Sequence, residues 1–209
     1  MTDGSSPAVD YGPAVRTAQL SLSPRTAGRA LYAALATLTL STLALSLYFG
    51  GAGDLWGPVN DVLVAATVLL LLPAIVVVRQ LTAGQVGGWL TVLTIGAMAG
   101  VFIMAAGQLA LVARLIELEA SFVTGTVSVL MAIAWLAGTG VLALRTHVLG
   151  RAVGWSALGF IVAVIITSVA IALVAMDTPT LSLVFGGPLL VTLVGWMISL
   201  GRDLTRRVV

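Results

Sequence analysis

The hydrophobic positions of this chain gather into six long runs, which polar and glycine-rich segments separate. The runs cover roughly residues 30–49, 58–78, 89–113, 122–144, 153–176 and 181–201. Each has the ~20 residues that an α-helix needs to cross a bilayer. They are apolar on all sides, whereas a membrane strand alternates apolar and polar residues over ~10 positions. The pattern therefore predicts an all-α integral membrane protein, built as a bundle of six transmembrane helices over residues 30–201.

Charged residues lie between the runs and at the chain ends. No charged residue occurs between Arg79 and Arg114, or between Glu119 and Arg145. Residues 1–29 are polar and rich in Gly, Pro, Ser and Thr, which is typical of a flexible tail. Residues 202–209 form a short basic tail. We expect the short connections to hold no separate domain.

The arginines are distributed unequally between the two sides that six crossings define. Three arginines precede the first run, three lie in the second and fourth connections, and three follow the last run. Arg114 is then alone on the other side. The positive-inside rule predicts that both termini are cytoplasmic. Abundant Ala, Gly and Arg without Lys is typical of a GC-rich bacterial genome, so we expect a bacterial inner-membrane protein.

The composition excludes several classes of protein and of site. Hydrophobic residues make up 59% of the chain and charged residues 9%, and the mean hydropathy is +1.13. Globular domains carry ~25% charged residues, so a soluble enzyme, a disordered chain and a nucleic-acid-binding domain are excluded. Without Cys there are no disulfides or thiolate metal sites, and without Lys there is no Schiff base. A single histidine, His147, also argues against a metal site, and we predict no cofactor beyond a bound lipid.

Catalytic motifs are incomplete in this sequence. The segment Gly154-Trp155-Ser156-Ala157 is close to the G-x-S-G motif of intramembrane serine proteases, but Ala157 replaces the second glycine and no histidine follows. A serine–histidine dyad cannot form without that histidine. Zinc and phosphate-binding motifs are missing as well. We therefore predict no catalytic residue and a protein that is not an enzyme.

Several polar residues lie at a common depth near the predicted outer ends of the runs. Asp61 opens the second run, Gln108 lies near the end of the third, and Arg114 and Glu117 follow it. These groups, with the nearly central Trp135, are the predicted ligand-binding residues around an outward-facing polar cavity. Asp61 could pair with Arg114, which would leave Glu117 to meet a cationic or hydroxylated ligand. Alternatively, Asp61 caps a helix, Glu117 is solvated, Gln108 bonds between helices and Trp135 packs in the core.

Glycine and proline positions predict how the helices pack. Gly96, Gly100 and Gly107 fall on one helical stripe, which favours close approach of a second helix. Pro73 is expected to kink the second helix, and Pro188 either kinks or interrupts the last one. The remaining tryptophans, expected in interfacial belts, are Trp56, Trp89, Trp155 and Trp196.

Two segments carry a further pattern. The first is Gly57-Pro58-Val59-Asn60-Asp61, which leads into an apolar helix ending at Pro73, Arg79 and Leu81; the second is Gly187-Pro188-Leu189, followed by Trp196 and Leu200-Gly201. Both resemble a group of small bacterial multi-pass membrane proteins of unknown function. The resemblance implies a six-helix bundle and assigns no activity or binding residue.

Three functions fit these observations. The first is a non-enzymatic accessory or partner-binding subunit of a membrane assembly, which contacts lipids and a membrane-protein partner or a second copy of itself, but no nucleic acid. The second is a component that binds or transports a small molecule or lipid at a cavity near Asp61, Gln108 and Arg114. The third is a membrane enzyme or redox subunit that uses a bound lipid or quinone.

Overall fold

The computed structural model describes residues 22–83, 87–174 and 179–207, and within them it contains helices and no strand. The helices are α1 (Pro24–Phe49), α2 (Trp56–Leu69), α3 (Leu72–Leu81), α4 (Trp89–Val112), α5 (Leu118–Thr146), α6 (Arg151–Val174) and α7 (Pro179–Arg206). The predicted all-helical class is confirmed. Most of the predicted N-terminal tail lies outside the described residues.

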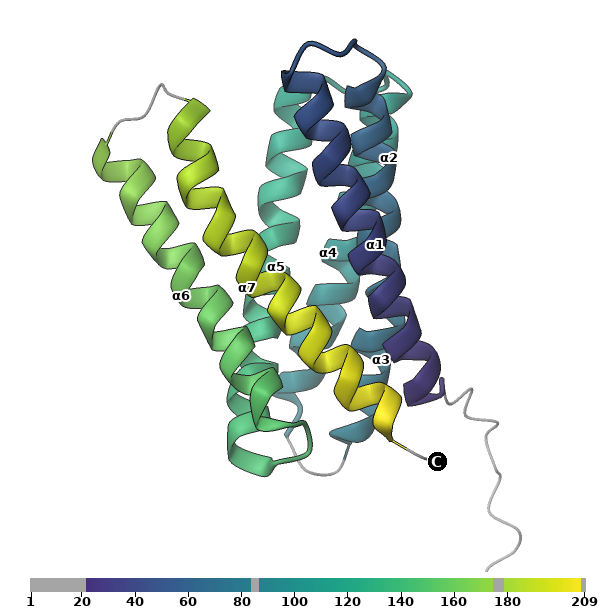
Figure 1. The fold of residues 1–209 in the computed structure, drawn as a ribbon. Coiled ribbons are helices and arrows are strands. Elements are labelled where there is room, and N and C mark those ends of the chain that lie inside the picture. The colour runs from purple at the N-terminus through teal and green to yellow at the C-terminus, as the bar shows by residue number, and fades with distance from the viewer. Residues whose placement is uncertain (1–21, 84–86, 175–178, 208–209) are drawn as a thin grey trace, which may run out of the picture.

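The helices pack in chain order as a closed ring. α1 packs against α2 and α3, these pack against α4, and α5, α6 and α7 follow in turn until α7 meets α1 again (Figure 1). Five spans are long and apolar enough to cross a membrane, namely α1, the combined α2–α3 segment, α4, α5 and α6. α7 is a further long helix. The arrangement agrees with an α-helical membrane bundle.

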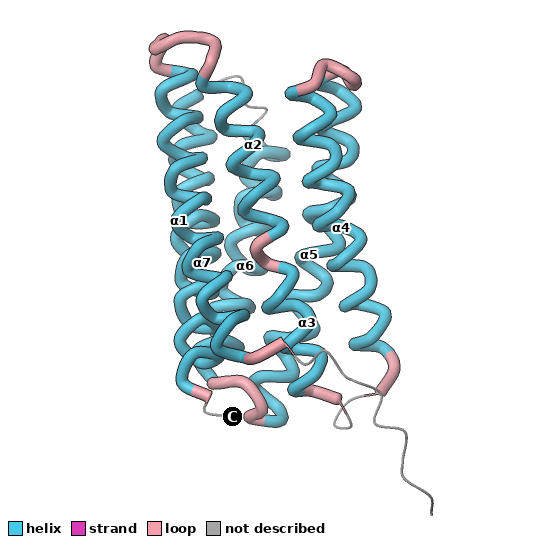
Figure 2. The backbone as a smooth tube through the Cα atoms, turned by 90° about the vertical axis from the view of Figure 1, so that its right-hand side faces the viewer, coloured by secondary structure: helices cyan, strands magenta, loops and turns pink. Residues whose placement is uncertain are grey.

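The second span is two helices, not one. Pro73 has no N–H, so the carbonyl of Leu69 lacks its usual helical donor. The N–H of Leu71 bonds to the carbonyl of Val68 at 3.1 Å, and the N–H of Ala74 bonds to that of Leu71 at 3.0 Å. These shortened i−3 bonds separate α2 from α3 near the middle of the span (Figure 2). The predicted kink is therefore a break, which also frees the carbonyls of Thr67 and Leu70.

The start of α1 and the end of α7 lie together at one end of the bundle. A Cβ added to Gly28 would lie 2.5 Å from Cγ2 of Thr205 and 2.9 Å from the carbonyl oxygen of Gly201. We call this end the basic end, because it carries most of the described arginines. They are Arg25, Arg29, Arg79, Arg145, Arg151, Arg202, Arg206 and Arg207. Arg114 lies at the opposite end, as the sequence predicts.

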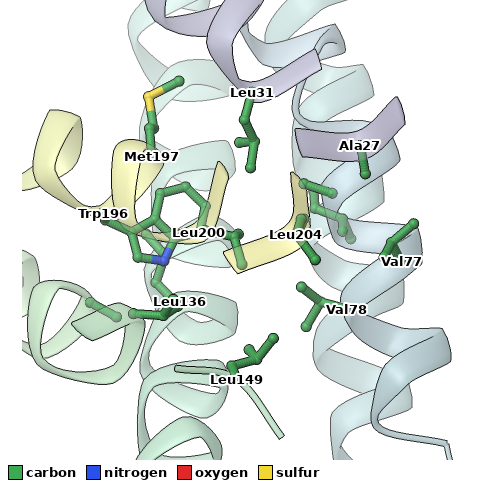
Figure 3. Packing of buried hydrophobic residues seen from close by; sticks show 14 of the residues in the cluster. Ala27, Leu31, Val77, Val78, Leu136, Leu149, Trp196, Met197, Leu200 and Leu204 are labelled. Atoms are coloured by element: carbon green, nitrogen blue, oxygen red, sulfur yellow. The ribbon is translucent and has the colours of Figure 1, made fainter. Parts of the chain in front are cut away.

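The buried apolar core lies in the half of the bundle nearest the basic end. Leu31 of α1, Val78 of α3 and Leu204 of α7 are at most 1% exposed, and they contribute to one cluster with Leu149 and Leu200 (Figure 3). Lipid tails are as apolar as leucine, so this cluster is stabilised by close packing more than by exclusion of water. This packing holds the helices together at the basic end.

In the other half, small residues bring α4 and α5 together. A Cβ on Gly100 would lie 3.1 Å from the carbonyl oxygen of Ser128, and one on Gly107 would lie 2.8 Å from Oγ1 of Thr124. These two glycines pack as predicted. The prediction is wrong for Gly96, where a Cβ would meet nothing within 4 Å. At that level α4 instead meets α5 through Leu93, whose Cδ1 would lie 2.6 Å from a Cβ added to Gly138.

Two helices extend beyond their predicted ends. α1 begins at Pro24 instead of residue 30, because the Ser23 side chain accepts a hydrogen bond from the Thr26 N–H at 3.2 Å and Pro24 suits the first helical turn. α7 continues to Arg206, through most of the predicted basic tail. It also runs through Pro188 without a break, so the alternative of an interrupted last helix is wrong.

The C-terminal end of α7 is tied to the α5–α6 connection. The guanidinium of Arg207 donates to the carbonyl oxygen of Val148 and pairs with the Asp203 carboxylate at 2.9 Å. These contacts satisfy the Arg207 guanidinium and the Asp203 carboxylate, and the apolar pattern of the sequence gives no indication of them. They explain why the helix persists past the hydrophobic run.

Candidate functional site

A chain of three polar side chains joins α1 to α2 near the opposite end of the bundle. Ser41 is 4% exposed, and its hydroxyl donates to Oδ1 of Asn60 at 2.7 Å. The Asn60 amide in turn donates to Oδ1 of Asp61 at 3.3 Å. We refer to Ser41, Asn60 and Asp61 as the polar chain. It holds a carboxylate in place within an otherwise apolar span.

A second polar contact continues along the same helix interface. The hydroxyls of Thr67 and Thr37 are hydrogen-bonded at 2.8 Å. Thr37 lies one helical turn from Ser41, and Thr67 lies seven residues, or about 10 Å, from Asn60. This pair is adjacent to the α2–α3 break and its free carbonyls. Polar groups therefore follow the α1–α2 interface from the opposite end to the middle of the membrane span.

Asp61 has no cationic partner. Between the described side chains, the ion pair that the structure contains joins Arg207 and Asp203 at the basic end. The predicted pair of Asp61 with Arg114 is therefore wrong. Arg114 follows the end of α4 in a left-handed conformation, with φ 58°, and its side chain is exposed. Asp61 is left half-buried with a neutral amide as its hydrogen-bond partner.

Gln108 lies on the interior side of α4, at a depth that matches Asp61. It follows Ala97, Val101 and Ala105, which are buried at helical spacing on that face. Its side chain is half-buried and makes no hydrogen bond to the described residues, so the interhelical bond considered for it is not formed. Because α2 packs against α4, Asp61 and Gln108 come from neighbouring helices.

The other predicted site residues lie elsewhere. Glu117 is exposed at the start of α5, where its backbone is extended and its side chain makes no capping bond. Trp135 is 3% exposed and packs edge-to-face on Trp196, with ring centroids 6.0 Å apart. Trp196 is therefore a core residue and not part of an interfacial belt, because α7 continues well past it. Trp89 and Trp155 are 47% and 66% exposed, as a belt requires.

Sequence reasoning missed Ser41, Thr37 and Thr67. A signal for them exists, because Thr37 and Ser41 are four residues apart, and Thr67 follows Asn60 by seven. Both spacings place polar groups on one helical face. The pattern was masked because isolated Ser and Thr are common in apolar helices, where they usually bond to their own backbone.

The arrangement offers several groups that can bind a ligand. Among the described residues, His, Cys, Asp and Glu form no group of three that could hold a metal ion. The polar chain offers one carboxylate together with amide and hydroxyl groups, and Gln108 adds a second amide. Such groups bind cations and hydroxyl groups through hydrogen bonds.

Comparison of the chain with protein families, curated proteins and solved structures gives no match. The resemblance of the Gly57–Asp61 and Gly187–Leu189 segments to small bacterial membrane proteins stays a prediction.

Proposed function

We propose that this protein is a membrane-embedded component that binds a small hydroxylated cation at the opposite end of the bundle. The observation that carries this proposal is the unpaired Asp61 carboxylate, which Ser41 and Asn60 hold on an apolar span. A charged group within a membrane span is costly and usually marks function. Gln108, on the neighbouring helix, supplies an amide for the hydroxyl group.

The α2–α3 break supports a role in transport. Interrupted helices in transporters present free backbone carbonyls to a ligand near the middle of the bilayer. Here the carbonyls of Thr67, Leu69 and Leu70 lie beyond the polar chain, next to the Thr37–Thr67 pair. A cation that moves inward from Asp61 would contact these carbonyl and hydroxyl oxygens along the α1–α2 interface.

The distribution of arginines supports an orientation for this site. With the basic end in the cytoplasm, Asp61 and Gln108 face the outside of a bacterial inner membrane. The ligand would then be taken from the external side. Both chain termini would be cytoplasmic.

Ethanolamine, a hydroxylated cation at neutral pH, is a suitable probe. We expect it to raise the thermal unfolding temperature of the purified protein saturably. Asp61→Asn should weaken its binding at least tenfold, because loss of a charge-assisted hydrogen bond costs more than about 1.4 kcal/mol. Gln108→Leu should weaken it less, since a neutral hydrogen bond contributes less.

Asp54→Asn is the matched control, because Asp54 is an exposed carboxylate close to the start of α2. It should leave ethanolamine binding unchanged. Glycerol tests whether the hydroxyl group alone is enough. Equal stabilisation of the wild type and Asp61→Asn by ethanolamine would rule the proposal out, as would no stabilisation of either.

A second candidate function is that of an accessory subunit. In that function a partner helix, in place of lipid, would cover a row of exposed apolar residues on α6. These residues are Val162, Ile165, Ile166 and Val169. Purification in mild detergent distinguishes the two functions: a co-purifying chain or a stable oligomer favours the subunit, and a monomer counts against it.

A further inference from the structure

Four exposed arginines lie around the contact between the first and the last helix at the basic end (Figure 1). Gly28 of α1 packs on α7, because a Cβ there would lie 2.9 Å from the carbonyl oxygen of Gly201 and 3.1 Å from the backbone nitrogen of Thr205. Each of the arginines is within one helical turn of one of these three residues. We call them the arginine quartet; they are Arg25, Arg29, Arg202 and Arg206.

Helical spacing places the arginine quartet on the outer surface of the bundle. Residues two apart in an α-helix lie on nearly opposite faces, since each residue turns by about 100°. The two arginines of α1 are each two residues from Ala27, which is 0% exposed. The two arginines of α7 are each two residues from Leu204, which is also 0% exposed. Because α1 and α7 are neighbours in the ring, the four side chains flank their contact on one surface.

The arginine quartet has no acidic counterpart among the described residues. The carboxylate described at the basic end belongs to Asp203, which pairs with Arg207 at 2.9 Å. Clustered charges of one sign raise the local concentration of the opposite ion. The positive-inside rule explains why arginines lie on this side of the membrane, but it does not require that arginines from both ends of the chain share one surface.

The depth of the arginine quartet matches that of lipid phosphate groups. Arg29 directly precedes the first apolar run, and Arg202 directly follows the last one. Arg25 and Arg206 lie four residues, or about 6 Å, further from the membrane centre. The headgroup layer begins where the hydrocarbon ends, so the quartet lies within that layer.

The surface next to the arginine quartet, toward the membrane centre, is apolar. Tyr32 and Ile198 are each 38% exposed there. The Tyr32 ring lies across the α1–α7 contact, because a Cβ on Gly201 would be 3.2 Å from its Cζ. The Tyr32 hydroxyl makes no hydrogen bond to a described residue. The surface thus changes from charged to apolar in the same order as a lipid changes from headgroup to acyl chains.

We propose that the arginine quartet binds the phosphate group of an anionic phospholipid on the outer side of the α1–α7 contact. Guanidinium groups bind phosphate oxygens through paired, charge-assisted hydrogen bonds, and the acyl chains lie along Tyr32 and Ile198. A zwitterionic lipid is disfavoured because its ammonium group is repelled by the same arginines. A lipid bound here contacts the first and the last helix together and so stabilises the closed ring.

Native mass spectrometry of the purified protein in mild detergent tests this proposal. The probes are dioleoyl phosphatidylglycerol and dioleoyl phosphatidylethanolamine, which have the same acyl chains and differ in headgroup charge. We expect phosphatidylglycerol to bind at least tenfold more tightly. Replacing Arg29 and Arg202 together by Gln should weaken its binding at least tenfold, because each arginine near a membrane surface contributes about fivefold. A second double variant, Arg25→Gln with Arg206→Gln, should weaken it as well.

The matched control is the double variant Arg145→Gln with Arg151→Gln. These arginines are also exposed at the basic end, but they flank the α5–α6 connection and not the α1–α7 contact. Their replacement removes the same charge and should keep the wild-type affinity for phosphatidylglycerol. Glycerol 3-phosphate carries the phosphate without acyl chains, and it should bind far more weakly.

Four results would overturn the proposal. They are equal binding of the two lipids, wild-type affinity in both quartet variants, an equal loss in the control variant, and binding of glycerol 3-phosphate as tight as that of phosphatidylglycerol. The last result would identify a soluble phosphate as the ligand. These measurements use no ethanolamine and concern the end of the bundle away from Asp61, so their outcome is independent of the cation site.

Discussion

Gly28→Leu is expected to destabilise the protein by about 2–3 kcal/mol, as overpacking of a close contact does. The backbones of α1 and α7 nearly touch at this point, since even a Cβ would lie 2.9 Å from the carbonyl oxygen of Gly201. A leucine must therefore push the first helix away from the last and open the ring. Unfolding by dodecyl sulfate in mixed micelles measures the change.

Gly159→Leu is the matched control. Gly159 is also helical, but a Cβ there would meet nothing within 4 Å. Its replacement should keep the free energy of unfolding or raise it by up to about 1 kcal/mol, because leucine has the better helix propensity. Equal stability of the Gly28 and Gly159 variants would show that α1 and α7 do not close the ring.

Gly100→Leu and Gly96→Leu should differ strongly, although the two positions are one helical turn apart on α4. At Gly100 a Cβ would lie 3.1 Å from the carbonyl oxygen of Ser128 and 3.2 Å from Cβ of Met131, so α5 must move. We expect a loss of about 2–3 kcal/mol. At Gly96 the space is open, and leucine has the better helix propensity, so stability should be kept or slightly raised.

The same unfolding assay measures both α4 variants. Because they share the helix and the added side chain, helix propensity and most of the hydrophobic contribution cancel in the comparison. A loss at Gly96 as large as that at Gly100 would contradict the α4–α5 packing described above.

The sequence predicted the parts of the fold that depend on composition alone. The six apolar runs, separated by charged and glycine-rich segments, correspond to long helices, and five of these are long and apolar enough to cross a membrane. The arginines at Arg79, Arg145 and Arg151 likewise indicated which connections share a side. In both cases the signal is local and repeats along the chain.

Features that depend on individual hydrogen bonds could not be predicted. Pro73 indicated a kink, but the break follows from where the N–H groups of Leu71 and Ala74 bond instead. The late end of α7 depends on Arg207, which contacts Val148 from a distant part of the chain. Apolar patterning does not contain such long-range information.

The candidate site was predicted in part. The common depth of Asp61 and Gln108 was visible in the sequence, because depth follows from position along each span. The sequence also placed Arg114 at this depth and predicted that it pairs with Asp61. That pair does not form, because the backbone conformation and exposure of Arg114 depend on how α4 ends. Ser41 was missed because its partner, Asn60, lies on another helix.

The central claim is that six crossings form a ring whose first and last helices share the arginine-rich cytoplasmic side. The chain has no cysteine, so single cysteines can be introduced without removing others. Suitable exposed positions are Leu22 and Ala83 at the basic end and Ala52 at the opposite end. Each of them tolerates a cysteine outside the packed core.

Labelling with a membrane-impermeant maleimide in intact cells is the most direct test. Ala52→Cys should be labelled in intact cells, whereas Leu22→Cys and Ala83→Cys should react only after the membrane is permeabilised. If the cysteine at position 22 reacts in intact cells, or if the one at position 52 does not, the proposed orientation is wrong and Asp61 does not face the outside.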